Sequence, residues 1–368
     1  MNVPKLRFKE FNDEWKKIQL DSFVDINPKN DSLPEQFIYI DLESVNNGIL
    51  TTRKIINKSE APSRAQRTIK ENDILYQTVR PYQMNNLFVK NFDSDYPYIA
   101  STGYALLRTK ENPYFVYSIL YQKSFVNKVL DMCTGTSYPA ISANDLGTIT
   151  VGLPSLKEQE KISKTLELLD KKIELQSKKI EALKLFTKNT ISNELNNLQN
   201  YNISKFKDIC NIQTGKSNTQ DKCDDGIYPF YIRSENIERS NNYIFDCEAV
   251  LTIGDGNIGK VFFYENGKFD CHQRVYVLNN FKNVLGKYVY YYFSSFFYKR
   301  AMSMSAKNTV DSVRMEMISD MIIKVPQEKE QIKMINLFSS LDKKLELEQN
   351  KLDKLQELKK GLMQNMFV

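Results

Sequence analysis

The pattern of apolar and polar positions divides the 368-residue chain into stretches of two kinds. Stretches 154–200 and 326–368 each open at a proline and carry apolar residues at helical spacing in a background of Lys, Glu and Gln. Stretches 1–153 and 201–325 hold short β-branched and aromatic runs, interrupted by Asn, Asp, Gly and Pro. The pattern predicts two β-rich globular domains, 1–153 and 201–325, each followed by one long helix.

Both predicted helices carry the same apolar stripe. Its positions are Leu166, Leu169, Ile173, Ile180 and Leu183 in the first helix, and Phe338, Leu341, Leu345, Leu352 and Leu355 in the second. This spacing follows the a and d positions of a heptad repeat. Gln176 and Glu348 interrupt the two stripes at the same place. We expect the helices to pack on each other through these stripes; the alternative is that each helix lies on its own domain.

The two halves of the chain are repeats of one unit. Segment 153–184 aligns without gaps with segment 325–356 at a constant offset of 172 positions, and Lys-Glu-Gln and Leu-Asp-Lys-Lys occur in both. The globular stretches also begin alike, with "LDSFVDINPKN" from Leu20 and "FKDICNIQTGK" from Phe206, at an offset of 186. The second globular stretch is therefore the shorter one.

Short runs inside the globular stretches predict strands and helices. The strand candidates are "FIYIDL" from Phe37, "DILYQTV" from Asp73, "YALLR" from Tyr104, "AVLTI" from Ala249 and "RVYVL" from Arg274. Each stretch ends in an aromatic helical segment, "PYFVYSILYQKSFVNKVL" and "KYVYYYFSSFFYKRAM".

Composition and charge exclude several kinds of protein. The five cysteines form no Cys-x-x-Cys pair and His272 is the only histidine, so we expect no metal site and no histidine-based catalysis. The most apolar run, 288–298, is shorter than the ~20 residues of a membrane span. Without a signal peptide at the start, we expect a cytoplasmic protein. A net charge of +6 is compatible with a polyanionic partner.

The stretch "LTIGDGNIGKVFF", 251–263, lacks the features of a phosphate-binding loop despite its spacing of Gly254, Gly259 and Lys260. Val261 stands where the metal-binding Ser or Thr is needed, and the residues that follow predict a strand instead of a helix. We expect a strand, a turn at Asn266-Gly267 and a second strand. "ENPYF" from Glu111 likewise lacks the second proline of an adenine methyltransferase motif. Neither motif indicates an enzyme.

Several loops carry side chains suited to DNA. Arginine can read guanine, Asn and Gln can read adenine, and Lys, Ser and Thr bind phosphates. The candidates are Arg64, Gln66, Arg67, Arg80, Tyr82, Gln83, Thr136, Ser137 and Tyr138 in the first domain, and Lys216, Arg233, Asn236, Arg239, Asn257, Lys260, Gln273, Arg274 and Lys307 in the second. Glycines in 254–259 are expected to let the backbone approach DNA closely. Any one of these residues could instead be an ordinary surface side chain, so the prediction rests on the set.

The repeated "LPSLKEQEKI" and "VPQEKEQIKMI" segments, with "TSYPAISANDLGTITVGLP" and "VLTIGDGNIGKVFF", resemble the DNA-specificity subunits of type I restriction–modification systems over nearly the whole chain. The resemblance implies an α+β fold with a pseudo-two-fold internal duplication. Two target-recognition domains, 1–153 and 201–325, are separated by spacer helices in 154–200 and 326–368 that form an antiparallel coiled coil.

The same resemblance implies a function. The chain is expected to have no enzymatic activity and no cofactor of its own, and to bind a bipartite double-stranded DNA target. Expected partners are two modification subunits that use S-adenosylmethionine and restriction subunits that use ATP and magnesium. The sequence departs from the family pattern where "GTSYP" of the first half aligns with "KNTVD" from Lys307, so only Lys307 keeps a phosphate-binding role there. The competing hypothesis is a coiled-coil scaffold whose heads bind protein or peptide.

Overall fold

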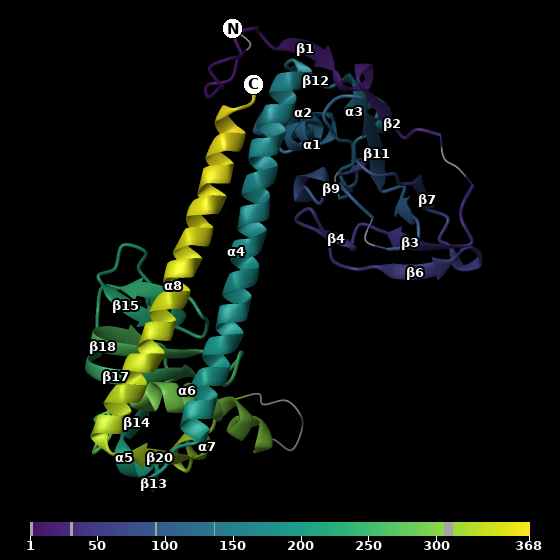
Figure 1. The fold of residues 1–368 in the computed structure, drawn as a ribbon. Helices are drawn as coiled ribbons and strands as arrows, with labels where there is room; N and C mark the ends of the chain where they lie inside the picture. The colour runs from purple at the N-terminus through teal and green to yellow at the C-terminus, as the bar shows by residue number, and fades with distance from the viewer. Residues whose placement is uncertain (1–2, 30–31, 93, 136, 305–311) are drawn as a thin grey trace. The chain divides into compact units, whose positions relative to one another are not determined.

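The computed structural model describes residues 3–29, 32–92, 94–135, 137–304 and 312–368 (Figure 1). The chain divides into two compact units. Unit 1 comprises Met1–Gln176 and Lys351–Val368, and unit 2 comprises Ser177–Asn350. Each unit therefore combines one globular stretch with parts of both long helices, α4 (Leu156–Asn196) and α8 (Glu328–Asn365).

Unit 1 contains sheets and short helices in close alternation. Its elements are β1 (Lys16–Gln19), η1 (Leu20–Ser22), β2 (Val24–Ile26), β3 (Gln36–Ile40), β4 (Val45–Asn46), β5 (Ile49–Leu50), β6 (Lys54–Asn57), η2 (Lys58–Glu60), β7 (Ala65–Thr68), β8 (Ile74–Gln77), η3 (Pro81–Gln83), β9 (Leu87–Phe88), β10 (Tyr98–Ser101), β11 (Tyr104–Thr109), α1 (Pro113–Ile119), α2 (Lys123–Met132), α3 (Ala143–Thr148) and β12 (Thr150–Leu153). The strand orders are β6-β3-β10-β7, β2-β11-β8-β9, β1-β12 and β4-β5. The runs from Phe37, Asp73 and Tyr104 form β3, β8 and β11, as predicted.

The first aromatic segment forms two helices instead of the single helical stretch predicted. α1 and α2 are separated by residues 120–122, where Gln122 has extended backbone angles, φ −69° and ψ 135°. The Gln122 side chain donates a hydrogen bond to the carbonyl of Ser118, which occupies the end of α1. Phe115 and Phe125 are buried against β8 and β11. The break lets both short helices present their apolar faces to one core.

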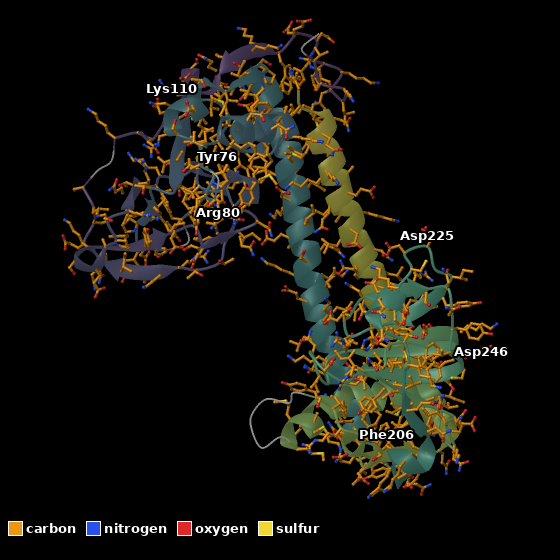
Figure 2. The ribbon with its side chains drawn as sticks, turned by 180° about the vertical axis from the view of Figure 1, so that it is seen from behind. Tyr76, Arg80, Lys110, Phe206, Asp225 and Asp246 are labelled. Carbon is orange, nitrogen blue, oxygen red and sulfur yellow. The ribbon has the colours of Figure 1, made fainter. Side chains whose placement is uncertain are left out.

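Unit 2 is built around one larger sheet. Its elements are β13 (Tyr201–Lys205), α5 (Phe206–Ile209), β14 (Asn211–Thr214), η4 (Thr219–Asp221), β15 (Tyr228–Tyr231), β16 (Ile237–Ser240), β17 (Phe245–Ile253), β18 (Phe262–Cys271), β19 (Val275–Asn279), α6 (Gly286–Ser303), α7 (Met315–Ser319) and β20 (Ile322–Pro326). The strand orders are β14-β19-β17-β18-β15-β16 and β13-β20. α6 packs its aromatic side chains between this sheet and the long helices, around the fully buried Phe206 labelled in Figure 2.

The predicted strand–loop–strand at 251–263 is confirmed, but the predicted Asn266-Gly267 turn is wrong. β18 continues through both residues and pairs with β17 from Phe262 to Phe269. Gly267 adopts φ 150°, a conformation open to glycine, and this keeps the strand in register without reversing it. The nine-residue β17 offers partners along this whole length, so the ladder prevails over the local turn preference.

The repeated Gln of each Lys-Glu-Gln motif joins two helix starts inside each unit. In unit 1, Gln159 is fully buried; its Nε2 donates to the Pro154 carbonyl at 3.0 Å, and its Oε1 accepts the N–H of Asn112, the N-cap of α1, at 3.2 Å. In unit 2, Gln331 donates to the Pro326 carbonyl at 2.8 Å and accepts the N–H of Leu285, the N-cap of α6, at 2.9 Å. We call this pair of contacts the glutamine clamp.

A repeated aspartate adds a second connection between the same helices. The Tyr114 hydroxyl of α1 donates to Asp170 of α4, and the Tyr291 hydroxyl of α6 donates to Asp342 of α8, the latter at 2.6 Å. Asp170 and Asp342 belong to the two Leu-Asp-Lys-Lys motifs. The repeated motifs therefore fasten each long helix to the aromatic helix of its own globular stretch.

The long helices lie side by side within each unit. In unit 1, Lys359 of α8 pairs with Asp170 of α4 at 2.5 Å, and Phe367 packs in one core with Leu166. In unit 2, Lys179 pairs with the buried Glu348 at 3.0 Å, and Leu195 packs in one core with Phe338. Late positions of one helix thus meet early positions of the other, so the helices run antiparallel.

The stripe residues are all buried or half-buried. Leu166, Leu169, Ile180, Phe338, Leu341 and Leu352 are buried, and Ile173, Leu183, Leu345 and Leu355 are half-buried. Glu348, the charged position in the second stripe, is buried at 6% exposure and is neutralised by Lys179. Breaking such a pair would leave a buried charge uncompensated.

We predict that Gln331→Leu lowers the stability of the protein by about 2 kcal/mol, because the Leu285 N–H and the Pro326 carbonyl both lose their partner. Urea unfolding of the purified chain measures this change. Gln327→Leu, at an exposed position four residues earlier, is the matched control and is expected to leave the midpoint unchanged. Equal midpoints for Gln331→Leu and wild type would contradict the clamp.

Candidate nucleic-acid interface

Unit 1 has a polar cavity of about 1070 Å³ formed by loops from distant parts of the chain. It is lined by Leu42, Glu43, Val45, Asn46, Thr51, Arg64, Gln77, Val79, Arg80, Gln83, Asn85, Thr102, Gly103 and Tyr138. These residues come from the β3–β4 turn, β4, the segments after β5 and before β7, the end of β8 and the loop after it, the β10–β11 turn and the loop before α3. The strand pairing within the two four-stranded sheets, β6-β3-β10-β7 and β2-β11-β8-β9, therefore positions the residues that line the cavity.

Buried Gln77 organises the loop that follows β8. Its Nε2 donates to the carbonyl of Val79 and to Oε1 of Gln83, both at 2.8 Å, and its Oε1 accepts the N–H of Asn85 at 3.1 Å. Asn86 adds a fourth contact, accepting the N–H of Gln77 at 2.8 Å. The loop presents its polar side chains from a fixed backbone.

The structure brings some of the predicted residues of the first domain into this cavity and leaves others out. Arg64, Arg80, Gln83 and Tyr138 line it. Gln66, Arg67, Tyr82 and Ser137 do not, and Thr136 lies outside the described residues.

Gln66 and Arg67, which do not line the cavity, both lie on strand β7. Gln66 is on β7 and donates to the Ser63 carbonyl at 2.7 Å. Its neighbour Arg67 is half-buried, and this burial lowers the pKa of the Arg67 guanidinium. Sequence reasoning missed Glu43, Asn46 and Thr102. Glu43 and Thr102 stand on separate turns and Asn46 on the short strand β4, and no local motif marks them.

Four loops of unit 2 are tied together by backbone hydrogen bonds. The N–H of Ser217 donates to the Cys271 carbonyl, and the N–H of Gln273 donates to the Ser217 carbonyl. The N–H of His272 donates to the Tyr231 carbonyl, and the N–H of Gly254 donates to the Arg274 carbonyl. These bonds join the loop after β14, the end of β15, the β17–β18 loop and the β18–β19 connection. Lys216, Arg233, Gln273 and Arg274 stand in or beside these connections, and all four are exposed.

The remaining predicted residues of unit 2 are less closely grouped. Asn257 and Lys260 are exposed in the β17–β18 loop, where the Lys260 ammonium lies 5.6 Å from the centre of the Tyr298 ring. Asn236 is exposed in the β15–β16 turn. Arg239 lies on β16 opposite Pro229 and donates to the Ile227 carbonyl, away from the turn. Lys307 lies outside the described residues.

The glycines at 254–259 serve the packing of the protein more than an approach to DNA. A Cβ on Gly254 would lie 2.7 Å from the Arg274 carbonyl oxygen, and one on Gly259 would lie 2.8 Å from the Tyr298 backbone. Only Gly256, at φ 79°, has open space around it. Of the three glycines, Gly256 alone fits the expected role.

His272 lies under the unit 2 loops, 5% exposed. Its Nδ1 accepts the N–H of Arg274 at 3.0 Å, an arrangement that requires an unprotonated Nδ1. Burial lowers the pKa of His272, the positive charges of Arg233 and Arg274 lower it further, and Asp255 and Asp221 oppose them. The fold therefore favours the neutral imidazole.

We predict that unit 2 loses stability as the pH falls below about 6.5, the ordinary pKa of histidine. Below this pH the histidine of the unfolded chain takes up a proton, while folded His272, with its lowered pKa, stays neutral. The stability contributed by neutral His272 is therefore complete above about pH 6.5 and is lost as the pH falls below it. Thermal unfolding between pH 7.5 and 5 measures the effect. His272→Asn, whose amide oxygen can replace Nδ1 as acceptor, is expected to show a smaller loss. If wild type and His272→Asn lose the same stability as the pH falls, the prediction is wrong.

Comparison with known proteins identifies the family. The family model described as "Type I restriction modification DNA specificity domain" matches residues 12–185 and 199–357, one copy in each half of the chain. The chain belongs to this family. The resemblance expected from the repeated motifs is confirmed, as are the duplicated α+β architecture and its long helices.

Two curated relatives of the specificity-domain family are similar over part of their length. One is "Type I restriction enzyme EcoDI specificity subunit" of Escherichia coli, 24% identical over 43% of this chain and 34% of that protein. The other is "Type I restriction enzyme HindI specificity subunit" of Haemophilus influenzae, 27% identical over 36% of this chain and 30% of that protein. The chain thus spans about a third of the curated relatives it matches.

Solved structures share the fold over the full chain. The type I restriction–modification system S subunit from M. genitalium has a TM-score of 0.64 at 18% identity, covering 100% of this chain and 99% of that one. A chain from a structure described as "complex assembly and conformational transition of the type I R-M system" has a TM-score of 0.60 at 19% identity, covering 95% and 96%.

Within the described part of the chain, no group of three or more His, Cys, Asp or Glu side chains is arranged to hold a metal ion. No helix in the same residues is long and apolar enough to cross a membrane.

Proposed function

We propose that this chain is the DNA-binding specificity subunit of a type I restriction–modification system and has no catalytic activity of its own. The observation that carries the proposal is the match of the DNA specificity domain to both halves of the chain. Each unit reads one half of a split double-stranded target, and two different halves make the target asymmetric.

The chemistry of the loops supports DNA as the ligand. The unit 1 cavity combines two arginines with the amides of Gln83 and Asn85, which are the side-chain types that read guanine and adenine in the major groove. The exposed Lys216, Arg274 and Gln273 of unit 2 offer the same mixture of phosphate-binding and base-reading groups. The cytoplasm, where chromosomal DNA is accessible, is the compartment that this function requires.

Methylation and cleavage then belong to partner subunits. We propose two modification subunits, which use S-adenosylmethionine, and restriction subunits, which use ATP and magnesium, while this chain binds no cofactor. The duplicated chain offers equivalent surfaces to two copies of one partner. Unit 1 exposes Leu175 of α4 and Leu358 of α8, and unit 2 exposes Leu347 of α8 and Phe186 of α4 at the matching repeat positions. Apolar side chains kept exposed in both copies fit a partner surface.

We predict that co-expression with the modification subunit yields methylated adenines in one split, asymmetric sequence. Long-read sequencing of the host DNA maps these adenines. The assembled complex is expected to lose DNA affinity steeply as salt rises, because each phosphate contact releases counterions. Methylation without sequence preference would refute the proposal, and salt-independent binding to protein but not DNA would favour the scaffold hypothesis.

We predict that Leu347→Glu reduces the complex from two modification subunits to one, because a charge replaces an apolar contact in only one of the two equivalent surfaces. Native mass spectrometry of the purified complex counts the subunits. Leu168→Glu is the matched control: Leu168 is also exposed on a long helix, but its repeat counterpart is Ser340, so it does not belong to the duplicated set. Two bound subunits in the Leu347→Glu complex would show that this surface is not the docking site.

A further inference from the structure

The backbone of the loop after β8 is held in an uncommon conformation at Arg80. Its φ of 54° lies in the left-handed region, as does the φ of 51° at Met84, and the two residues flank the single turn η3. Residues other than glycine rarely adopt backbone angles in this region unless their surroundings enforce them. Here the Arg80 N–H donates to the Pro139 carbonyl at 2.7 Å, and the Gln77 amide fixes the rest of the loop.

The Arg80 side chain is oriented by stacking. Its guanidinium carbon lies 4.3 Å from the centre of the Tyr138 ring, and Tyr138 is 64% exposed. The Arg80 Nε is buried and has no hydrogen-bond partner among the described residues. In contrast, the guanidinium groups of Arg7 and Arg108 are paired with the carboxylates of Glu158 and Asp73.

No carboxylate in the described part of the chain pairs with Arg80, so its two terminal nitrogens are the groups available to a ligand in the cavity. A planar fork of two N–H donors matches the O6 and N7 acceptors of guanine on the major-groove edge. The cavity wall also carries the carboxylate of Glu43, which disfavours a phosphate, and the amides of Gln83 and Asn85. These neighbours favour a base edge as the ligand. Figure 2 labels Arg80 and also Tyr76, which is on the preceding strand β8.

We propose that Arg80, held by its stack on Tyr138, reads one guanine in the half-site of unit 1. Arg80 is the specificity-determining residue, and Tyr138 is a positioning residue that keeps the guanidinium plane at the required angle. This inference rests on the proposed DNA-binding function and specifies one base of its target class.

The first test maps methylation by the co-expressed complex carrying Arg80→Ala or Arg80→Lys. Both variants are expected to relax the preference for guanine at one position of one half-site, by roughly 5- to 150-fold, which is the discrimination that a bidentate pair supplies. The other half-site is expected to stay unchanged. Lys110→Ala is the control, because Lys110, also labelled in Figure 2, is exposed in unit 1 but does not line the cavity.

The role of Tyr138 is tested by rescue. Tyr138→Ala is expected to relax the same guanine position as Arg80→Ala, whereas Tyr138→Phe keeps an aromatic face and retains most of the preference. A merely structural role would lower methylation at all sites without changing base preference. Unchanged guanine preference in Tyr138→Ala would remove the positioning role.

A second measurement is made first on the wild-type complex, so its main result does not depend on any variant folding. Each guanine of the mapped half-sites is replaced by 7-deazaguanine, which lacks the N7 acceptor, and binding of the wild-type complex is measured. At one guanine, affinity is expected to fall about 10-fold or more, and Arg80→Lys is expected to show a smaller further loss there. If no guanine responds, the inference is wrong.

The outcomes separate this inference from the function on which it rests. If the wild-type complex methylates no split sequence, the proposed function itself fails. If the split sequence is found but Arg80→Ala keeps the guanine preference, only this inference fails. If Arg80→Ala weakens binding equally for all sequences and reduces the salt dependence, Arg80 contacts a phosphate and the guanine assignment is wrong.

Discussion

The glutamine clamp is the interaction on which the arrangement of each unit depends. A buried amide at the start of each long helix joins that helix to the aromatic helix of the preceding globular stretch. A side-chain amide carries both a donor and an acceptor, so one residue can satisfy two backbone groups that would otherwise be buried without partners. An apolar side chain of similar size could fill the space but could not make these bonds. The duplication has kept the clamp in both units.

A rigid frame suits the function proposed for the loops. Base reading requires donors and acceptors held within a fraction of an ångström, and long side chains lose entropy when they bind unless they are already oriented. In unit 1, Gln77 fixes the backbone of the loop after β8, and Tyr138 fixes the orientation of the Arg80 side chain. In unit 2, backbone hydrogen bonds among four loops hold those loops in place. The two units share the glutamine clamp and carry different loops, which suits the proposed asymmetric target.

The stretch at 251–263 illustrates how a local motif is decided by its surroundings. Its Gly-x-x-x-x-Gly-Lys spacing matches a phosphate-binding loop, yet it joins two paired strands, β17 and β18, with no helix amino terminus to receive a phosphate. Gly254 and Gly259 are required because other backbone segments pass within 3 Å of where a Cβ would stand. Glycine spacing alone therefore does not reveal which close approach the glycines permit.

The sequence by itself determined the features that depend on local, periodic patterns: the two long helices, their apolar stripes, the duplication, the family, and the strands β3, β8, β11, β17, β18 and β19. Local patterns suffice there because helix periodicity and strand alternation repeat along the chain. Only the tertiary structure decided which loops meet. Glu43, Gln77 and Thr102, which no local pattern marked, reach one cavity with the predicted Tyr138 through pairing between distant strands, while the predicted Arg67 is half-buried outside it. The break after α1 and the continuation of β18 through Asn266-Gly267 were decided in the same way, because packing against a core or a long partner strand outweighs a local preference.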